Sequence, residues 1–273
     1  MTLHAPKPMR NFTLLWFGQV ISTIGSYMTQ FSVKLWLWDQ TEQATTLTAM
    51  SLLSVVSGLV MAGVAGILVD RWHRKGVLFA SDGVAAGVTL GLLLLFWSDR
   101  LHLWHFYIGE IVQGAAGEVQ FLAYSSATAA MLTQQDYSRA SSMNAAIHYS
   151  AIIFAPAIAG TLYPQIGFGG IAMIDLATFG VGMATLLWAS IPSTARTSTN
   201  DHPSSFKQTL QSINQAFDGF RYLANHRGLF TLLGVSLGFE FAHELGSALY
   251  TPMILARSQN DSAVLGTVNA AAG

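Results

Sequence analysis

The stretch Gly66-Ile67-Leu68-Val69-Asp70-Arg71-Trp72-His73-Arg74-Lys75 is a short charged turn between two long apolar segments. Residues 43–69 and residues 83–98 contain no Asp, Glu, Lys or Arg. Apolar runs of about 20 residues can cross a bilayer core as helices. The stretch therefore predicts two membrane-spanning helices joined by a tight turn, and its Arg and Lys side chains place that turn on the cytoplasmic side.

The same pattern extends over the rest of the chain. Of its 273 residues, 52% are hydrophobic and only 10% are charged, whereas about 25% of residues are charged in a soluble domain. Seven membrane-spanning helices and the start of an eighth are predicted. Their cores lie near residues 12–36, 46–69, 77–97, 103–125, 140–163, 168–190 and 228–252, and the eighth begins near residue 262.

The positions of the basic residues predict how these spans are oriented. With the N-terminus inside, most of the 13 Lys and Arg residues fall on the cytoplasmic side, as the positive-inside rule expects. The cytoplasmic residues are Lys7, Arg10, Arg71, Arg74, Lys75, Arg139, Arg196, Lys207, Arg221 and Arg227, and the outward ones are Lys34, Arg100 and Arg257. We therefore expect a multi-pass protein of the inner or plasma membrane with a cytoplasmic N-terminus.

One connection is long, and it divides the chain. Residues 1–190 are predicted to form a six-helix transmembrane bundle, and residues 228–273 the first helices of a second bundle. Residues 191–227 between them carry apolar side chains at helical spacing, typical of a cytoplasmic linker with an amphipathic helix. Because the sequence stops within an apolar run, we expect an N-terminal fragment whose partner is the missing C-terminal bundle.

The charged turn also resembles a signature of the major facilitator superfamily, G-x-x-x-D-R-x-x-R-R/K, in the same loop between the second and third helices. The match is complete at Gly66, Asp70, Arg71, Arg74 and Lys75. The resemblance implies an all-α membrane fold, in which a six-helix bundle of two inverted three-helix repeats is followed by a second bundle. It also implies a gating role for the turn, with Gly66 allowing two helices to approach closely.

Two other stretches are similar to the bacterial drug-efflux branch of that superfamily, which includes macrolide exporters. They are the first helix, at residues 12–19 and 22–25, and residues 155–160, which resemble the G-P-x-x-G-G packing element of the fifth helix through Pro156 and Gly160. Ala replaces Gly at positions 155 and 159, and the fourth helix lacks the Arg of many drug and proton antiporters. The resemblance implies export of small amphiphilic molecules by alternating access.

Polar and ionisable side chains at membrane depth are costly, so they are candidates for a substrate or proton pathway. In this chain the candidates are Gln19, Glu118, His148, Asp175, Glu240 and Glu244. Carboxyl and imidazole groups could bind a cationic substrate or carry a coupling proton, and the alternative is that they pair structurally between helices. Asp82 is expected in a cytoplasmic charge network with Asp136 and Arg139.

These features favour a secondary transporter of a small molecule over other classes. The net charge of −1 argues against nucleic-acid binding, and zero Cys excludes disulfides and thiolate metal sites. There is no hydrolytic or Walker A motif, so we expect no enzyme activity, catalytic residue, cofactor or metal. The alternatives are an uptake porter of the same fold, an integral membrane enzyme and a seven-helix receptor.

Overall fold

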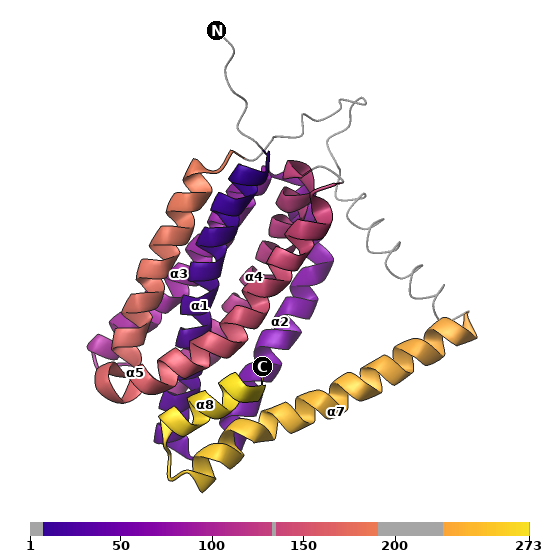
Figure 1. Cartoon of the computed structure of the whole chain (residues 1–273). Helices are drawn as coiled ribbons and strands as arrows, with labels where there is room; N and C mark the ends of the chain where they lie inside the picture. The colour runs from indigo at the N-terminus through magenta and orange to yellow at the C-terminus, as the bar shows by residue number, and fades with distance from the viewer. Residues whose placement is uncertain (1–7, 133–134, 191–225, 273) are drawn as a thin grey trace. The chain divides into compact units, whose positions relative to one another are not determined.

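The computed structural model describes residues 8–132, 135–190 and 226–272, and within these ranges every regular element is an α-helix (Figure 1). The helices are α1 (Pro8–Thr41), α2 (Ala44–Arg71), α3 (Arg74–Trp97), α4 (Leu103–Met131), α5 (Tyr137–Trp188), α7 (Arg227–Arg257) and α8 (Ser262–Ala272). The predicted all-α fold is confirmed, and each predicted span falls within one of these helices to within two residues. The amphipathic helix predicted in residues 191–227 lies outside the described residues.

The chain divides into two compact units. One comprises residues 1–193 and 251–273, and the other comprises residues 194–250. In the second unit the described residues form most of α7, a single apolar helix. The first unit holds α1 to α5 and α8, together with the cavity described below. The division into domains at residues 190 and 227 stays a prediction.

The two predicted spans 140–163 and 168–190 form the two limbs of α5, which reverses direction between them (Figure 1). At the break, Gly167 has φ 62° and ψ −171°, a region of backbone space that is essentially restricted to glycine. Pro164 lies one turn earlier and weakens the helical hydrogen bonding there. The sequence thus encodes a turn inside what is otherwise one long apolar helix.

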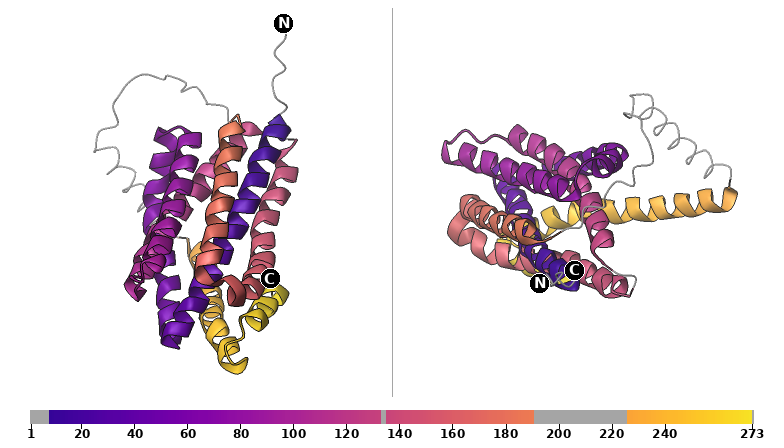
Figure 2. Two further views of the ribbon diagram at one scale, coloured as in Figure 1. Left: turned by 90° about the vertical axis from the view of Figure 1, so that its left-hand side faces the viewer. Right: turned by 90° about the horizontal axis from the view of Figure 1, so that it is seen from above.

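Helix α1 lies along both limbs of α5 (Figures 1 and 2). Trp16 Nε1 donates to the carbonyl of Met143, and Tyr163 donates to Asp39 at the other end, so α1 runs parallel to the first limb. Asn11 donates to the carbonyl of Ser190, whereas Ser26 contacts Asp175, so α1 runs antiparallel to the second limb. These directions agree with successive spans that cross a membrane in alternating sense.

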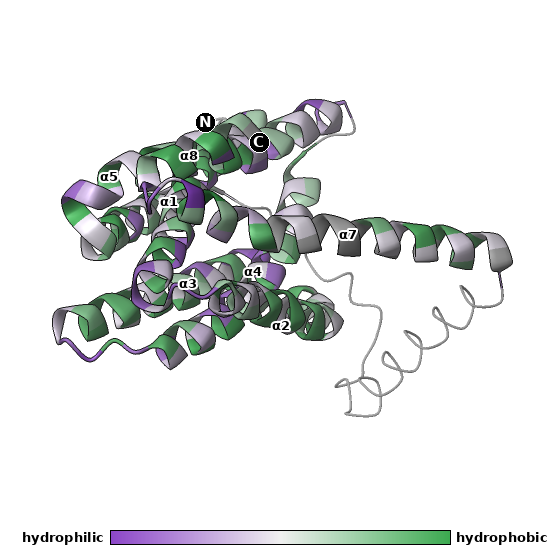
Figure 3. Cartoon of the chain, turned by 90° about the horizontal axis from the view of Figure 1, so that it is seen from below, coloured by the Kyte–Doolittle hydropathy of each residue, from purple (hydrophilic) through white to green (hydrophobic). Residues whose placement is uncertain are grey.

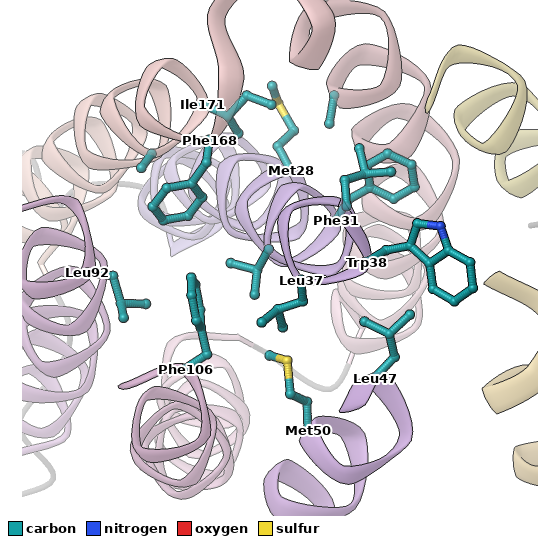
Figure 4. Close-up of a cluster of buried hydrophobic side chains, with 14 of the residues drawn as sticks. Met28, Phe31, Leu37, Trp38, Leu47, Met50, Leu92, Phe106, Phe168 and Ile171 are labelled. Atoms are coloured by element: carbon teal, nitrogen blue, oxygen red, sulfur yellow. The ribbon is translucent and has the colours of Figure 1, made fainter. Parts of the chain in front are cut away.

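Two apolar clusters lie toward opposite ends of α1. One contains Phe12 and Leu15 with side chains from α2 to α5. The other contains Met28, Phe31, Leu37, Phe106 and Phe168 among its buried residues (Figure 4). In the second cluster the rings of Phe106 and Phe168 are 5.9 Å apart in an edge-to-face arrangement, a favourable geometry for aromatic pairs. Between the clusters, from Gln19 to Ser26, α1 is polar.

The outward surface of the helices is apolar rather than charged. On α2, Leu52, Val55, Leu59 and Val60 are each more than 60% exposed, and the ribbon of α2 is mostly hydrophobic in Figure 3. Three described segments are long and apolar enough to cross a membrane, namely Ala44–Gly66, Arg74–Trp97 and Tyr137–Trp188. A surface of this kind is stable in lipid and unfavourable in water.

Candidate functional site

A cavity of about 780 Å³ lies within the first unit, beside the polar segment of α1. It extends as far as Tyr137, the first residue of α5. Its lining consists of Gln19, Ser22, Thr23, Ser26, Tyr27, Gln30, Ser54, Ala85, Gln113, Gly117, Gln120, Phe121, Tyr124, Ser125, Thr128, Tyr137, Ala140, Ser141, Asn144, Ile147, His148 and Phe179. Four helices besides α1 therefore contribute to one shared space.

The described residues of the lining are polar but carry no permanent charge. They include the amides of Gln19, Gln30, Gln113, Gln120 and Asn144, several hydroxyls and a few aromatic rings, and none of them is Asp, Glu, Lys or Arg. Their titratable groups are three tyrosines and His148. Such a surface holds a ligand through hydrogen bonds and ring contacts, which suits amphiphilic molecules better than it suits multiply charged ones.

A chain of three polar side chains, two in the lining and one behind it, connects α1, α4 and α3. The Gln120 amide donates from Nε2 to Gln19 Oε1 at 3.3 Å and to Asp82 Oδ1. Asp82 is 1% exposed, and its Oδ2 has no hydrogen-bond partner. The expected cytoplasmic network of Asp82 with Asp136 and Arg139 is therefore wrong. Asp82 lies on the interior stripe of α3 with Leu78, Ser81 and Ala85, since residues three and four apart share a helix face.

Two further hydrogen bonds fix aromatic side chains at the cavity. The Tyr27 hydroxyl lies 3.2 Å from His148 Nδ1, and the two rings meet edge to face. The Tyr124 hydroxyl donates to Asn144 Oδ1 at 3.1 Å. Each pair joins α5 to a helix on another side of the cavity. The Tyr27–His148 pair therefore places an imidazole within the cavity lining.

A second buried carboxyl, Asp175, lies on the second limb of α5 and outside the lining. It is 1% exposed. Ser26 of α1 donates to Oδ1 at 3.3 Å, and Thr89 of α3 donates to Oδ2 at 3.2 Å. Both oxygens therefore have hydroxyl partners, which offset part of the cost of burial. Asp175 thus connects three helices.

The sequence matches the model of the Major Facilitator Superfamily over residues 15–273. The chain belongs to this superfamily. The predicted membership is confirmed, as is the expectation of a multi-pass membrane protein from a transporter family.

Relatives within the superfamily include named exporters. The chain is 24% identical to macrolide efflux protein A of Streptococcus pyogenes over 243 residues, which is 89% of this chain and 58% of that protein. A macrolide efflux protein A of Enterococcus faecalis is 24% identical over 206 residues, covering 76% of this chain and 61% of that protein. The uncharacterized MFS-type transporter YkuC of Bacillus subtilis (strain 168) is 23% identical over 225 residues, which is 82% of this chain and 52% of that protein. The chain thus spans little more than half the length of these relatives.

The superfamily turn at residues 66–75 forms the end of α2 and the start of α3, as predicted. Lys75 Nζ donates to the carbonyls of Leu187 at 2.8 Å and Ala189 at 3.0 Å, at the C-terminal end of α5. The side chains of Asp70 and Arg71 lie outside the described residues, and Arg74 is half-buried. The close approach expected at Gly66 is not found in the described part, because a Cβ there would meet no atom within 4 Å. Helix α2 packs mainly on α4 instead.

The predicted packing element of the fifth helix contacts α8. A Cβ on Gly160 would lie 2.5 Å from the carbonyl oxygen of Ser262 and 3.1 Å from the Cα of Gly266. Ser262 Oγ also donates to the carbonyl of Gly160 at 3.1 Å. Opposite Gly160, a Cβ on Gly266 would lie 2.5 Å from the carbonyl oxygen of Pro156. Small residues on both helices therefore allow their backbones to touch.

The structure brings together some of the predicted pathway residues and separates others. Gln19 and His148 both line the cavity. Glu118 is half-buried and outside the lining, since it lies one residue, or about 100° around α4, from the lining residue Gly117. Asp175 lies behind the wall, and the side chains of Glu240 and Glu244 are outside the described residues. The functional roles of all six stay predictions.

Sequence reasoning missed Asp82, Tyr27 and Gln120, although signals for them exist. Asp82 lies four residues from Leu78 and seven from Thr89, at helical spacing within the buried stripe of α3. In the described part of the chain, no group of three or more His, Asp or Glu side chains is placed to hold a metal ion.

Proposed function

We propose that this chain forms the cargo-binding half of a secondary transporter that exports small amphiphilic molecules by alternating access. The protein lies in the cell membrane with a cytoplasmic N-terminus, it has no enzymatic activity, and protons drive export. The 66–75 turn biases the balance between inward-open and outward-open states. The C-terminal bundle of the same protein would complete the cavity.

The observation that supports this proposal is the chemistry of the cavity. Amides, hydroxyls and rings line it, and none of the described lining residues carries a fixed charge. A cargo with a polar edge and an apolar body can exchange water for these groups at little cost, whereas a multiply charged cargo would lose far more hydration without an ion pair among these residues. The similarity to macrolide efflux proteins supports cargo of that size and polarity.

The extent of the cavity supports the direction. Its lining reaches Tyr137, where α5 begins. The distribution of Lys and Arg supports a cytoplasmic position for that end of the bundle. Cargo would therefore have access to this cavity from the cytoplasm, which export requires.

The test is accumulation of radiolabelled erythromycin and of a fluorescent cationic dye in energised bacterial cells that express the protein. Export lowers the steady-state level of the probe, and collapse of the proton gradient restores it. Gln113→Leu, in the lining, should reduce export severalfold at equal amounts of protein in the membrane. Gln165→Leu is the matched control, because Gln165 is exposed and donates only to the carbonyl of Thr161.

Raised accumulation of the probe in expressing cells would contradict export and favour the uptake porter. Equal effects of Gln113→Leu and Gln165→Leu would contradict the assignment of this cavity to cargo. Export that persists without a proton gradient would contradict the proposed driving force alone.

A further inference from the structure

Asp82 differs from the cavity residues because cargo cannot reach it. It is 1% exposed and outside the lining, yet it accepts a hydrogen bond from Gln120, which is in the lining. One of its oxygens, Oδ2, is buried without a partner, and so is Nε2 of Gln19. Unsatisfied buried polar atoms are rare and costly, so an arrangement with two of them requires an explanation.

The ionised Asp82 carboxylate dictates how the two amides are turned. A carboxylate can only accept hydrogen bonds, so Gln120 must point its NH₂ group toward it. The same nitrogen also donates to Gln19 Oε1 at 3.3 Å, so both N–H groups of the Gln120 amide are used. The atom of Gln120 that remains for the cavity is therefore its carbonyl oxygen, an acceptor. Asp82 thus sets the hydrogen-bonding character of a wall that it does not form.

A protonated Asp82 would reverse this arrangement. The carboxyl group would become a donor, and Gln120 would lower its energy by turning its oxygen toward the new O–H. Its NH₂ group would then face the cavity. Gln19, no longer receiving an N–H from Gln120, would be free to turn its own unpaired NH₂ group toward the Gln120 oxygen. One proton would therefore change Gln120 from an acceptor to a donor in the cavity.

We propose that Asp82 is the proton-binding site of the transporter, and that Gln120 and Gln19 relay its protonation to the cargo by inverting their amides. The inference rests on the proposed export function and specifies its cargo. Molecules with hydroxyl or ammonium donors bind while Asp82 is ionised and are released when it takes up a proton. Proton and cargo then exclude each other without sharing a site, and their linkage is reciprocal.

The carboxylate of Asp82 interacts with the amides of Gln120 and Gln19 rather than with a cation. In the described part of the chain, no Lys, Arg or His side chain is hydrogen-bonded to it. Of the titratable groups on the neighbouring helices, Tyr124 is bonded to Asn144, Asp175 to Ser26 and Thr89, and His148 to Tyr27. Glu118 lies on a different side of α4, outside the lining.

The first experiment measures binding of radiolabelled erythromycin, which carries hydroxyls and an amine, to the purified full chain between pH 5 and pH 8. Wild-type affinity should fall as the pH falls, by at most about tenfold per pH unit for one linked proton. Asp82→Asn cannot titrate, so its profile should be flatter. Asp39→Asn is the matched control, because Asp39 is an exposed carboxyl on the same protein, bonded to Tyr163 and outside the cavity.

The second experiment needs no cargo. Infrared difference spectra of the protein, isotope-labelled in its Gln side chains, are recorded as the pH is lowered. A carboxylic acid band should appear together with a shift of the Gln amide band, and both should be absent in Asp82→Asn. Gln120→Leu should keep the carboxylic acid band but lose the pH dependence of binding, which tests the relay even if Asp82→Asn folds poorly.

The outcomes separate the two proposals. If the bands titrate but erythromycin does not bind, the export proposal fails for this probe and the proton site stands. If neither the carboxylic acid band nor the Gln amide band differs between wild type and Asp82→Asn, the proposed proton site is wrong, whether or not erythromycin binds. The proton-site proposal would also be overturned if wild type, Asp82→Asn and Gln120→Leu bound erythromycin with equal pH profiles. It would likewise be overturned if binding followed the sodium concentration at constant pH.

Discussion

Replacement of Lys75 by Met tests whether the last position of the superfamily turn acts in gating or in holding the bundle together. The structure shows Lys75 Nζ within 2.8 Å and 3.0 Å of the carbonyl oxygens of Leu187 and Ala189. These carbonyls belong to the last turn and the end of α5, where the helix has no further N–H groups to satisfy them. A cation placed there also interacts favourably with the helix dipole. The geometry therefore predicts a structural role.

The expected loss of stability in Lys75→Met follows from the two charge-assisted hydrogen bonds that the ammonium group donates. Each contributes about 1.5–3 kcal/mol when it is well buried. Lys75 is only partly buried and one of its bonds is exposed, so screening and side-chain entropy reduce the total to about 1–2 kcal/mol. Met keeps much of the length and apolar volume of the Lys stem, which limits the loss to the ammonium group.

The assay is reversible unfolding in mixed micelles of increasing SDS content, followed by far-ultraviolet circular dichroism. Lys75→Met should unfold at lower SDS content, by an amount equivalent to about 1–2 kcal/mol. Arg74→Met is the matched control on the same turn. In the described part of the chain Arg74 has no hydrogen bond to α5, so this change should alter the free energy of unfolding by less than about 0.5 kcal/mol. Equal stability of Lys75→Met and wild type, combined with altered transport, would refute the reasoning and restore a gating role.

Three further substitutions test the packing. Gly160→Ala should lower the free energy of unfolding by about 1–3 kcal/mol, because its Cβ would lie 2.5 Å from the Ser262 carbonyl oxygen where α5 meets α8. Gly180→Ala is the control in the same SDS titration, and it should be neutral or stabilising because the space around Gly180 is open. Phe106→Ala should lower the free energy of unfolding by about 3–5 kcal/mol, because the Phe106 side chain is only 1% exposed. Ile108→Ala should lower it far less, because Ile108 is 51% exposed. Asp175→Ala should cost about 1–3 kcal/mol more than Asp175→Asn, because Asn retains an acceptor for Thr89; equal losses would show that the hydroxyl contacts contribute nothing.

Much of the fold could be predicted from the sequence because hydrophobic length is a strong constraint in a membrane protein. The spans and the reversal near Gly167 follow from charge-free runs that Gly and Pro interrupt. The direction of side chains was harder to predict. Glu118 and Gln120 are two residues apart on α4, and only Gln120 lines the cavity. A carboxylate at mid-depth indicates function, but the residue's position around the helix decides which space it can reach.

The same reasoning explains why Asp82 escaped prediction. Its short separation in sequence from the charged turn at residues 66–75 favours a cytoplasmic charge network, but separation along the chain does not show which side of the helix a residue occupies. The helical phase places it on the interior stripe of α3, opposite Gln120. Its partner is an uncharged amide, which a search for opposite charges does not reveal. Contacts between polar neutral groups on different helices depend on the packing of the whole bundle.

The two buried carboxyls of this bundle illustrate how partners distinguish structure from function. Asp175 receives a hydroxyl on each oxygen, so its burial is offset, and each hydroxyl can serve the ionised or the protonated form by rotating about its C–O bond. Asp82 has one amide partner and one unpaired oxygen. An amide can present either end, so the partner of Asp82 can satisfy both the ionised and the protonated form. Rotation of a hydroxyl leaves its oxygen in place, whereas inversion of the Gln120 amide exchanges an acceptor for a donor in the cavity lining. Of the two carboxyls, Asp82 is therefore the one whose protonation changes the lining in this way, which is the property that a coupling site requires.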